Sequence, residues 1–220
     1  MTISTSSWLK QSRNIINGHY LSKRLNLKFI TGIIKKISHE SKCKHEPWLT
    51  ADSVRILDGW ISQNDKILEF GSGQSTTWFT TKSKHVISIE HDKDWYQKTK
   101  NIPGAKVILC KTKDKHLSIL KKIKNDSIDA CLVDGQWRRD CLLEVFSKIK
   151  PGGIIILDNA ETILPISWPS QSFQDSWQKQ GAQEKVKTKK IIKELKKWRQ
   201  LSTSDVTQDT VIYVKKYSNN

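Results

Sequence analysis

No stretch of this 220-residue sequence approaches the roughly 18 consecutive apolar residues that a membrane-spanning helix requires. The most apolar candidate, residues 29–37, is short and contains Lys35 and Lys36. Residues 2–7 are polar, and no apolar core of a secretory signal is visible. We therefore expect a cytoplasmic protein without a membrane span.

Cysteine is also scarce. The chain has four cysteines, and no two of them form a Cys-x-x-Cys pair. Three of them, Cys110, Cys131 and Cys141, fall in segments expected to be strands or helices, where a free thiol behaves as a small apolar residue. The fourth is Cys43. The sequence therefore indicates a reduced protein without a structural zinc site.

Arginine supplies only six of the 38 basic residues, although the net charge is +16. Recognition of bases and phosphates relies on the planar fork of arginine, which lysine lacks. A surplus of lysine is more typical of a solvated basic surface. An anionic substrate or a nucleic acid is the alternative explanation of the charge.

From Lys66 onward the sequence alternates short apolar runs with segments of helical periodicity. Near-continuous apolar runs such as 128–133 and 154–157 are typical of strands buried on both faces of a parallel sheet. Alternating units of this length predict a doubly wound α/β sheet. The expected strands are 66–70, 85–90, 106–110, 128–134 and 153–158, and the expected helices lie near 75–82, 92–100, 115–124 and 138–149.

The segments outside this alternation suggest the domain organisation. Residues 1–47 are basic with amphipathic spacing and are expected to form an N-terminal helical extension, while 48–220 form the main domain. A helix is expected to follow Thr50, which would serve as its N-cap. Residues 160–197 are interpreted as a variable insertion, an aromatic-rich loop followed by a lysine-rich helix within 179–197.

A tight turn follows the first expected strand, in the sequence Glu69-Phe-Gly71-Ser-Gly73. Two glycines at this spacing let the backbone turn sharply and approach a ligand, and the helix that follows near Ser75 offers unpaired N–H groups. Glu90 ends the next expected strand, where a carboxylate accepts hydrogen bonds from ribose hydroxyls. Together these residues predict a site for a cofactor that contains adenosine.

The acid before the glycines distinguishes between cofactors. A dinucleotide would bring a pyrophosphate to this turn, and the carboxylate of Glu69 would repel it. The third glycine of the dinucleotide motif is missing, since Thr76 occupies its place. S-adenosylmethionine carries an ammonium and a sulfonium and no phosphate, so a nearby Glu69 favours S-adenosylmethionine.

These features resemble class I S-adenosylmethionine-dependent methyltransferases over about residues 48–216. The matching elements are Glu69-Phe-Gly71-Ser-Gly73, Glu90, Val133-Asp134-Gly135 and Lys150-Pro-Gly152-Gly153. The resemblance implies a Rossmann-like sheet of seven strands, mostly parallel, whose last strand is antiparallel and whose final hairpin comprises 198–203 and 210–214. It also implies that Asp114 approaches the adenine amino group, although Asp114 fits equally well as the N-cap of a helix beginning near Lys115.

Two further acids, Asp134 and Asp158, end adjacent expected strands, so their oxygens would meet at one edge of the sheet. Together with Asn159 they resemble the metal ligands of cation-dependent O-methyltransferases, which implies a Mg²⁺ site. The stretch after Asp134, Gly135-Gln-Trp-Arg-Arg139, departs from that family. The alternative is a site without metal, with Asp134 as general base and the neighbouring arginines as positive partners.

The sequence therefore predicts a methyltransferase that acts on an oxygen of a small or medium polar acceptor. Trp168, Phe173 and Trp177 are expected on the acceptor side. One alternative is an RNA or other nucleic-acid methyltransferase that uses the basic surface, although no Asp-Pro-Pro-Tyr, Asn-Pro-Pro-Tyr or Pro-Cys motif of base methylation is present. The other alternative is a non-catalytic binding protein with the same fold.

Overall fold

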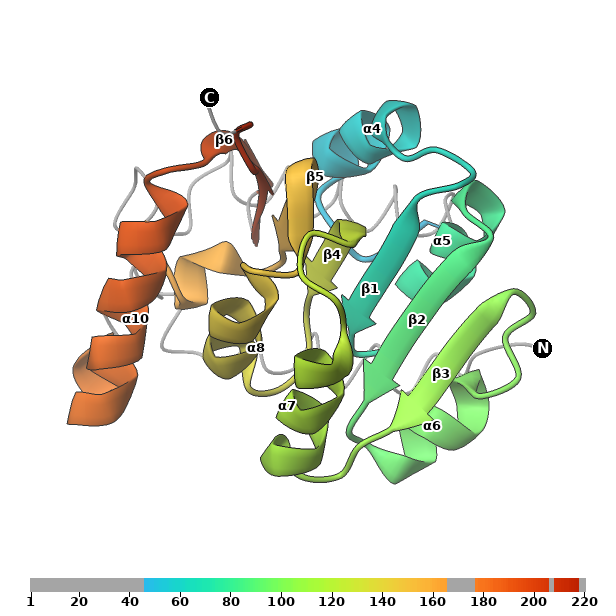
Figure 1. The fold of residues 1–220 in the computed structure, drawn as a ribbon, viewed down its shortest axis with the longest axis horizontal. Coiled ribbons are helices and arrows are strands. Elements are labelled where there is room, and N and C mark those ends of the chain that lie inside the picture. Colours follow the sequence, from blue (N-terminus) through green and yellow to red (C-terminus); the bar gives the residue numbers. More distant parts are fainter. Residues whose placement is uncertain (1–45, 166–176, 206–207, 218–220) are drawn as a thin grey trace, which may run out of the picture. The chain divides into compact units, whose positions relative to one another are not determined.

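The computed structural model of the chain describes residues 46–165, 177–205 and 208–217 (Figure 1). The expected N-terminal extension lies almost entirely outside these residues, and so do Trp168 and Phe173. The account that follows concerns the described residues.

Seven strands form one sheet in the order β3-β2-β1-β4-β5-β7-β6. All neighbouring pairs are parallel except those of β7, which runs antiparallel to both β5 and β6. The predicted fold class, a mostly parallel seven-stranded sheet with an antiparallel last strand, is therefore confirmed. The strands are β1 Lys66–Phe70, β2 His85–Glu90, β3 Ala105–Leu109, β4 Ile128–Val133, β5 Ile149–Leu157, β6 Arg199–Ser204 and β7 Asp209–Val214.

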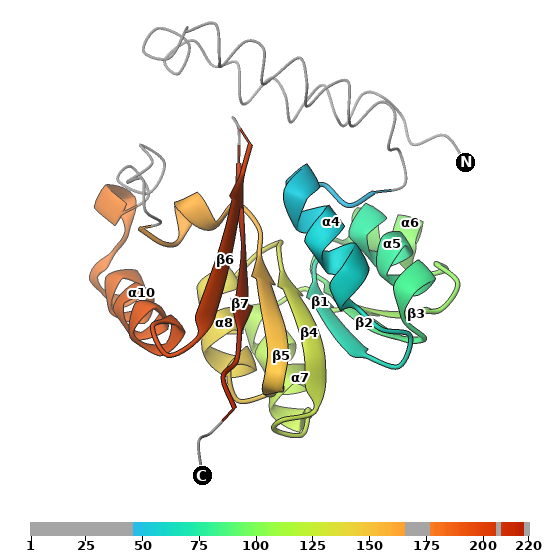
Figure 2. The same cartoon turned by 90° about the horizontal axis from the view of Figure 1, so that it is seen from above.

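Helices cover both faces of this sheet. Figure 2 shows α4, α5 and α6 on one side and α7, α8 and α10 on the other. The placement follows from the right-handed crossovers of a doubly wound sheet, in which the chain changes faces when it passes from one half of the sheet to the other. The helices are α4 Ala51–Trp60, α5 Gln74–Lys82, α6 Lys93–Thr99, α7 Lys113–Lys122, α8 Arg138–Val145 and α10 Ala182–Leu195, with a short 3₁₀ turn, η1, at Ala160–Thr162.

Several boundaries differ from the sequence prediction by one to four residues. Helix α8 ends four residues before the predicted end, because Ile149 already pairs with Ile128 as the first residue of β5. Helix α7 begins at Lys113, and its N-cap is Thr112, whose side chain accepts from the Lys115 N–H. The prediction that Asp114 caps this helix was therefore wrong.

Thr50 does occupy the N-cap position of α4, but its side chain makes no capping bond to that helix. Its hydroxyl instead contacts the hydroxyls of Ser53 and Thr203, and its N–H donates to the Thr210 hydroxyl at 3.2 Å. The sequence located the helix start correctly. The capping hydrogen bond was not formed, because strands β6 and β7 offer Thr50 other partners.

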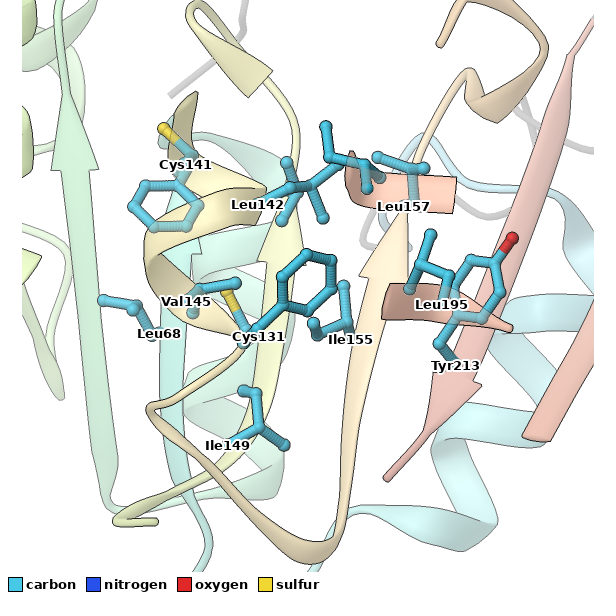
Figure 3. Packing of buried hydrophobic residues seen from close by; sticks show 14 of the residues in the cluster. Leu68, Cys131, Cys141, Leu142, Val145, Ile149, Ile155, Leu157, Leu195 and Tyr213 are labelled. Atoms are coloured by element: carbon cyan, nitrogen blue, oxygen red, sulfur yellow. The ribbon is translucent and has the colours of Figure 1, made fainter. Parts of the chain in front are cut away.

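Two apolar layers enclose the sheet. The larger layer joins one face of the strands to α7, α8 and α10, and Figure 3 shows how its side chains interlock around Cys131, Cys141 and Leu142. The smaller layer joins the other face to α4 and α5. Neighbours such as Ile67 and Leu68 belong to opposite layers, as the alternation of side chains along a strand requires.

Cys110, Cys131 and Cys141 are buried free thiols, in agreement with the prediction that they act as small apolar residues. Burial raises the pKa of the Cys141 thiol to about 12, which keeps it protonated and unreactive. Among the helices of the described segments, none combines the length and the apolar character needed to cross a membrane.

Candidate active site

Four acids lie at the carboxyl edge of the sheet, as predicted. Glu69 and Glu90 belong to the ends of β1 and β2, while Asp134 and Asp158 directly follow β4 and β5. Asp134 and Asp158 come after Val133 and Leu157, which are paired across the two strands. This edge is where ligands bind in open α/β sheets.

The turn after β1 requires glycine at its first position. Gly71 has φ +96°, in the left-handed region, and its N–H donates to the Ile89 carbonyl oxygen at 2.9 Å. Gly135, after β4, also has a positive φ of +76°, and a Cβ there would lie 3.4 Å from the Gly71 Cα. The two loops therefore lie backbone to backbone, and the positive φ at both positions favours glycine.

Trp95 covers the second glycine of this turn. Its indole N–H donates to the Ser72 carbonyl oxygen, and a Cβ on Gly73 would lie 3.4 Å from the indole nitrogen. Trp95 comes from α6, which begins at the side-chain cap of Asp92. The turn is therefore held from the outside by a helix of the next βα unit.

Glu90 is a fully engaged carboxylate. It is 2 % exposed, and one oxygen accepts from the N–H and the hydroxyl of Ser72, both at 2.8 Å. The other oxygen accepts from the N–H groups of His91 and Asp92 at 2.8 Å. Since a carboxylate offers about four acceptor positions, its capacity is filled by the protein itself. The Ser72 hydroxyl also lies 2.8 Å from the Thr99 hydroxyl, which offers it a second partner.

Glu69 lies beneath the turn and not on its surface. Its carboxyl group is 1 % exposed and accepts from the hydroxyls of Ser75, Thr76 and Ser88, the last two at 2.5 Å. Burial raises the pKa of Glu69 to about 7, although the three hydroxyls oppose this shift. The sequence located Glu69 correctly at the end of β1 but did not reveal its depth.

Arg138 is the positive partner on the other half of the edge. One terminal nitrogen donates to the Asp134 carboxylate at 2.5 Å, and the other donates to the Asp158 carbonyl oxygen at 2.7 Å. The Nε–H donates to the Gly135 carbonyl oxygen at 3.0 Å. The Asp134 side chain is nonetheless 47 % exposed, so it can meet a ligand from the solvent side.

Asp158 is buried behind this ion pair. Burial raises the pKa of its carboxyl group, the negative charge of Asp134 raises it further, and Arg138 opposes both effects. Thr210 on β7 donates to the Asp158 carboxyl oxygen at 3.1 Å. Asp134 and Asp158 thus differ in kind, one facing solvent and one enclosed by the sheet.

The predicted Mg²⁺ site is not supported by this geometry. Among the described residues no group of three or more histidine, cysteine or acidic side chains is arranged to hold a metal ion. The guanidinium of Arg138 is already paired with the Asp134 carboxylate, so it would repel a divalent cation that approached this group. Asn159 adopts a left-handed conformation and leads into η1. The residues Asp134, Asp158 and Asn159 therefore do not fit a magnesium site in this arrangement.

Asp114 takes no part in these contacts. It is exposed in the first turn of α7, and its approach to an adenine stays a prediction. His116, two residues further along the helix, was not identified from the sequence. It is 2 % exposed, and neither of its ring nitrogens has a hydrogen-bond partner within the described segments.

An aromatic cluster surrounds His116. The Phe70 ring lies 5.4 Å and the Trp137 ring 5.5 Å from the His116 ring, and His91 lies 5.9 Å from Trp137 on the outside. Burial lowers the pKa of His116 to about 4, so this imidazole is neutral at physiological pH. Trp137 reaches the cluster with a left-handed backbone, φ +54°. An isolated histidine on an amphipathic helix gives no sequence signal for such a cluster.

Comparisons with known proteins define the fold family. No protein-family model and no curated protein sequence matches the chain. Among solved structures, a putative caffeoyl-CoA O-methyltransferase from Staphylococcus aureus matches with TM-score 0.51 and 16% identity over 94% of this chain and 99% of that chain. An O-methyltransferase from Bacillus cereus in complex with S-adenosylhomocysteine matches with TM-score 0.52 and 13% identity over 96% and 99%.

A protein from Corynebacterium glutamicum matches with TM-score 0.54 and 10% identity over 99% of this chain and all of that chain. At such identities the likeness establishes the fold. The chain has the Rossmann-like fold of S-adenosylmethionine-dependent methyltransferases, as the sequence resemblance implied.

Proposed function

We propose that this protein is an S-adenosylmethionine-dependent methyltransferase that methylates an oxygen of a small or medium polar acceptor. The proposal rests on one contact at the carboxyl edge of the sheet. The N–H of Ser72, inside the Gly71–Gly73 turn, donates to the Glu90 carboxylate. The fold shared with two O-methyltransferases supports it. A reducing compartment such as the cytoplasm belongs to the proposal and agrees with the buried free thiols.

Glu90 would hold the ribose of the cofactor. Its oxygens are filled by protein donors, so a ribose hydroxyl must replace one of them. The Ser72 hydroxyl is the donor that can leave, because it can turn towards the Thr99 hydroxyl at 2.8 Å. The three backbone N–H groups would stay in place and keep the carboxylate oriented.

Glu69 would respond to the charge of the cofactor. A cation near the turn favours the ionised form of this buried carboxyl group, whose pKa of about 7 leaves it partly protonated at neutral pH. Binding of a cationic ligand would therefore release a proton from Glu69 and become tighter as the pH rises through 7. A pyrophosphate would have the opposite effect.

Asp134 would accept the proton of the acceptor hydroxyl. Its exposed carboxylate is oriented by Arg138 and by the Gly135 N–H, which donates at 2.7 Å. When bound, S-adenosylmethionine supplies an electrophilic methyl group. The acceptor oxygen forms a bond to that carbon, its proton passes to Asp134, and the sulfur leaves as a neutral thioether.

The proposal is tested by calorimetry with S-adenosylmethionine, S-adenosylhomocysteine and NAD. Both adenosyl compounds should bind and NAD should not. Glu90→Ala should weaken their binding by about 1.5–3 kcal/mol, the value of hydrogen bonds to a charged group. Asp94→Asn, an exposed acid on the neighbouring α6, is the matched control and should bind normally.

Glu90→Gln keeps the shape of the side chain and is used if Glu90→Ala does not fold. Tight NAD binding without a response to either adenosyl compound would refute the proposal. Cofactor binding without turnover of hydroxylated acceptors would favour the non-catalytic alternative. Turnover of RNA alone would favour the nucleic-acid alternative.

A further inference from the structure

An open pocket of about 430 Å³ adjoins Asp134 on the face of the sheet that carries α7, α8 and α10. Figure 1 shows these three helices side by side, and η1 lies next to them. The pocket is lined by residues of all three helices, of the loop before α8 and of the η1 turn. They include Lys113, Trp137, Arg139, Asp140, Ile163 and Glu184. Gly135 and Arg138 both line the pocket and hydrogen-bond to Asp134, so the proposed base lies beside the pocket although it is not one of the lining residues.

The two acids of the pocket wall share one lysine. The Nζ of Lys187 lies 2.9 Å from an Asp140 carboxylate oxygen and 2.6 Å from a Glu184 carboxylate oxygen. Both acids raise the pKa of Lys187 through hydrogen bonds, against the effect of its burial. One lysine balances only one of the two carboxylates, so the acidic part of the wall keeps one net negative charge.

The cations of the wall are Lys113, Arg138 and Arg139, and Arg139 interacts electrostatically with both acids. Arg139 donates to the Thr188 hydroxyl at 2.9 Å and to the Thr162 carbonyl oxygen at 3.2 Å. Burial lowers the pKa of Arg139, a sign that its charge lies in a poorly solvated place. Lys113 is exposed at the mouth and, within the described part of the chain, forms no ion pair.

The remaining wall is apolar. Ile163 is 2 % exposed, and Trp137 presents an indole ring that also packs on His116. The pocket thus combines an apolar surface with cationic groups, next to a carboxylate that is accessible from solvent. Its volume lies in the range of small-molecule sites, roughly 300–1,000 Å³.

We propose that this pocket binds the methyl acceptor, and that the acceptor is a small molecule with an apolar or aromatic body, a hydroxyl group and a carboxylate or phosphate. Arg139 and Lys113 bind the anionic group, Trp137 and Ile163 contact the body, and the hydroxyl faces Asp134. A hydroxylated aromatic acid has this combination of groups. The assignment rests on the proposed methyltransferase function, which gives Asp134 its role.

The test uses a pair of probes that differ in charge, 4-hydroxybenzoate and 4-hydroxybenzyl alcohol. Their binding to the full chain is measured by ligand-observed NMR in the presence of S-adenosylhomocysteine. The benzoate should bind at least tenfold more tightly than the alcohol, and inorganic phosphate should compete with it. Raising the salt concentration should reduce this preference, because the exposed part of the attraction is screened.

Lys113→Gln should weaken benzoate binding about threefold without changing the affinity for the alcohol. Lys121→Gln, two turns further along the exposed side of α7, is the matched control and should bind both probes normally. Arg139→Gln should reduce benzoate binding by a factor of ten or more. Because Arg139 also contacts α10, its variant is compared only if its thermal unfolding is unchanged.

Equal affinities for the two probes, or a Lys113→Gln variant that binds benzoate normally, would overturn the proposal. Competition by an RNA oligonucleotide but not by phosphate would assign the pocket to a polymer and overturn it as well. Binding of S-adenosylmethionine is measured separately by calorimetry. Benzoate selectivity without that binding contradicts the methyltransferase function, and that binding without benzoate selectivity contradicts the pocket assignment.

Discussion

The two halves of the carboxyl edge satisfy their acids in different ways. On the β1–β2 half, Glu69 and Glu90 receive hydrogen bonds from hydroxyls and backbone N–H groups, which are neutral, and the His91 ring nitrogen lies 3.1 Å from a Glu90 carboxylate oxygen. On the β4–β5 half, Asp134 receives a full positive charge from Arg138, which also binds the carbonyl oxygen of Asp158. The first half therefore holds its acids mostly through neutral donors, with Glu69 partly protonated at neutral pH, and the second half balances Asp134 with a cation.

This difference separates two kinds of ligand. Neutral donors stabilise a carboxylate without removing its field, so the β1–β2 half attracts a cation such as a sulfonium or an ammonium. The ion pair of the β4–β5 half leaves a weaker field, next to a pocket whose wall carries three cations and two acids. A cationic donor and an anionic acceptor can then lie on one edge without competing for the same acids.

Removing Arg138 should disrupt the β4–β5 half of the edge and cause the largest loss of stability. Arg138→Gln loses the ion pair with Asp134 and the bonds to two carbonyl oxygens. We expect the free energy of unfolding to fall by about 3 kcal/mol, because hydrogen bonds from a charged group to the two carbonyl oxygens are lost, while the pair with the half-exposed Asp134 contributes less. Urea unfolding measures it, and Arg55→Gln, at an exposed pair on α4, should change it little.

The double variant Arg138→Gln/Asp134→Asn separates the cost of leaving the Asp134 carboxylate unpaired from the loss of the other Arg138 contacts. It should recover part of the lost stability, since the unpaired carboxylate is also removed. A single variant as stable as the parent would show that Arg138 is not the partner that holds this half together.

Glu69→Gln tests the β1–β2 half of the edge through the pH dependence of stability. The pKa of Glu69 in the folded chain is about 7, above the ordinary 4.5, so the folded state binds the extra proton between these values. Its contribution is therefore fully present below about pH 4.5 and is lost as the pH rises to 7 and beyond, a loss of about 3 kcal/mol. Glutamine resembles the protonated carboxyl, so the variant should exceed the parent by about this amount at pH 8 and by little at pH 4.5.

Chemical unfolding at the two pH values measures this difference. Asp52→Asn, at an exposed acid of α4, is the control and should not become more stable at pH 8. A Glu69→Gln variant that is less stable than the parent at pH 8 would show that the hydroxyls bind the ionised carboxylate strongly enough to outweigh burial.

The smallest effect concerns divalent metal. If Arg138 balances the charge of Asp134 without a cation, EDTA should change turnover less than twofold, and added Mg²⁺ should not raise it. Methyl transfer to hydroxylated acids, with and without the chelator, measures this. Loss of turnover in EDTA, restored by Mg²⁺, would mean that Arg138 moves aside for a cation when the acceptor binds.

The strands were predicted best, because their signals are local. β1 and β2 have the predicted bounds, since each is an apolar run that ends at an acid and a turn. The start of β5 was misplaced because it depends on distant partners. The Gly152 N–H donates to the Lys215 carbonyl oxygen, and Lys215 also binds the Ile149 carbonyl oxygen. No local pattern reveals such contacts.

The acids of the site were predicted from the sequence, but the partners that each acid binds were not. The depth of Glu69 follows from its register opposite Ser88, which strand pairing decides. The choice of Arg138 over a metal depends on where α8 begins and on the left-handed backbone of Trp137 before it. These features arise from tertiary packing, so the sequence could name the acids and their possible positive partners but not choose among the partners.

The position of β7 has a consequence for synthesis. It is the last strand in the described part of the chain, yet it lies between β5 and β6, and its Thr210 contacts Asp158. Until residues 209–214 have left the ribosome, β5 has an unpaired edge and β6 has no neighbour. The nascent chain therefore carries an exposed, strongly apolar strand, a template for aggregation, until its final hairpin closes the sheet and completes the acceptor half of the edge in the same step.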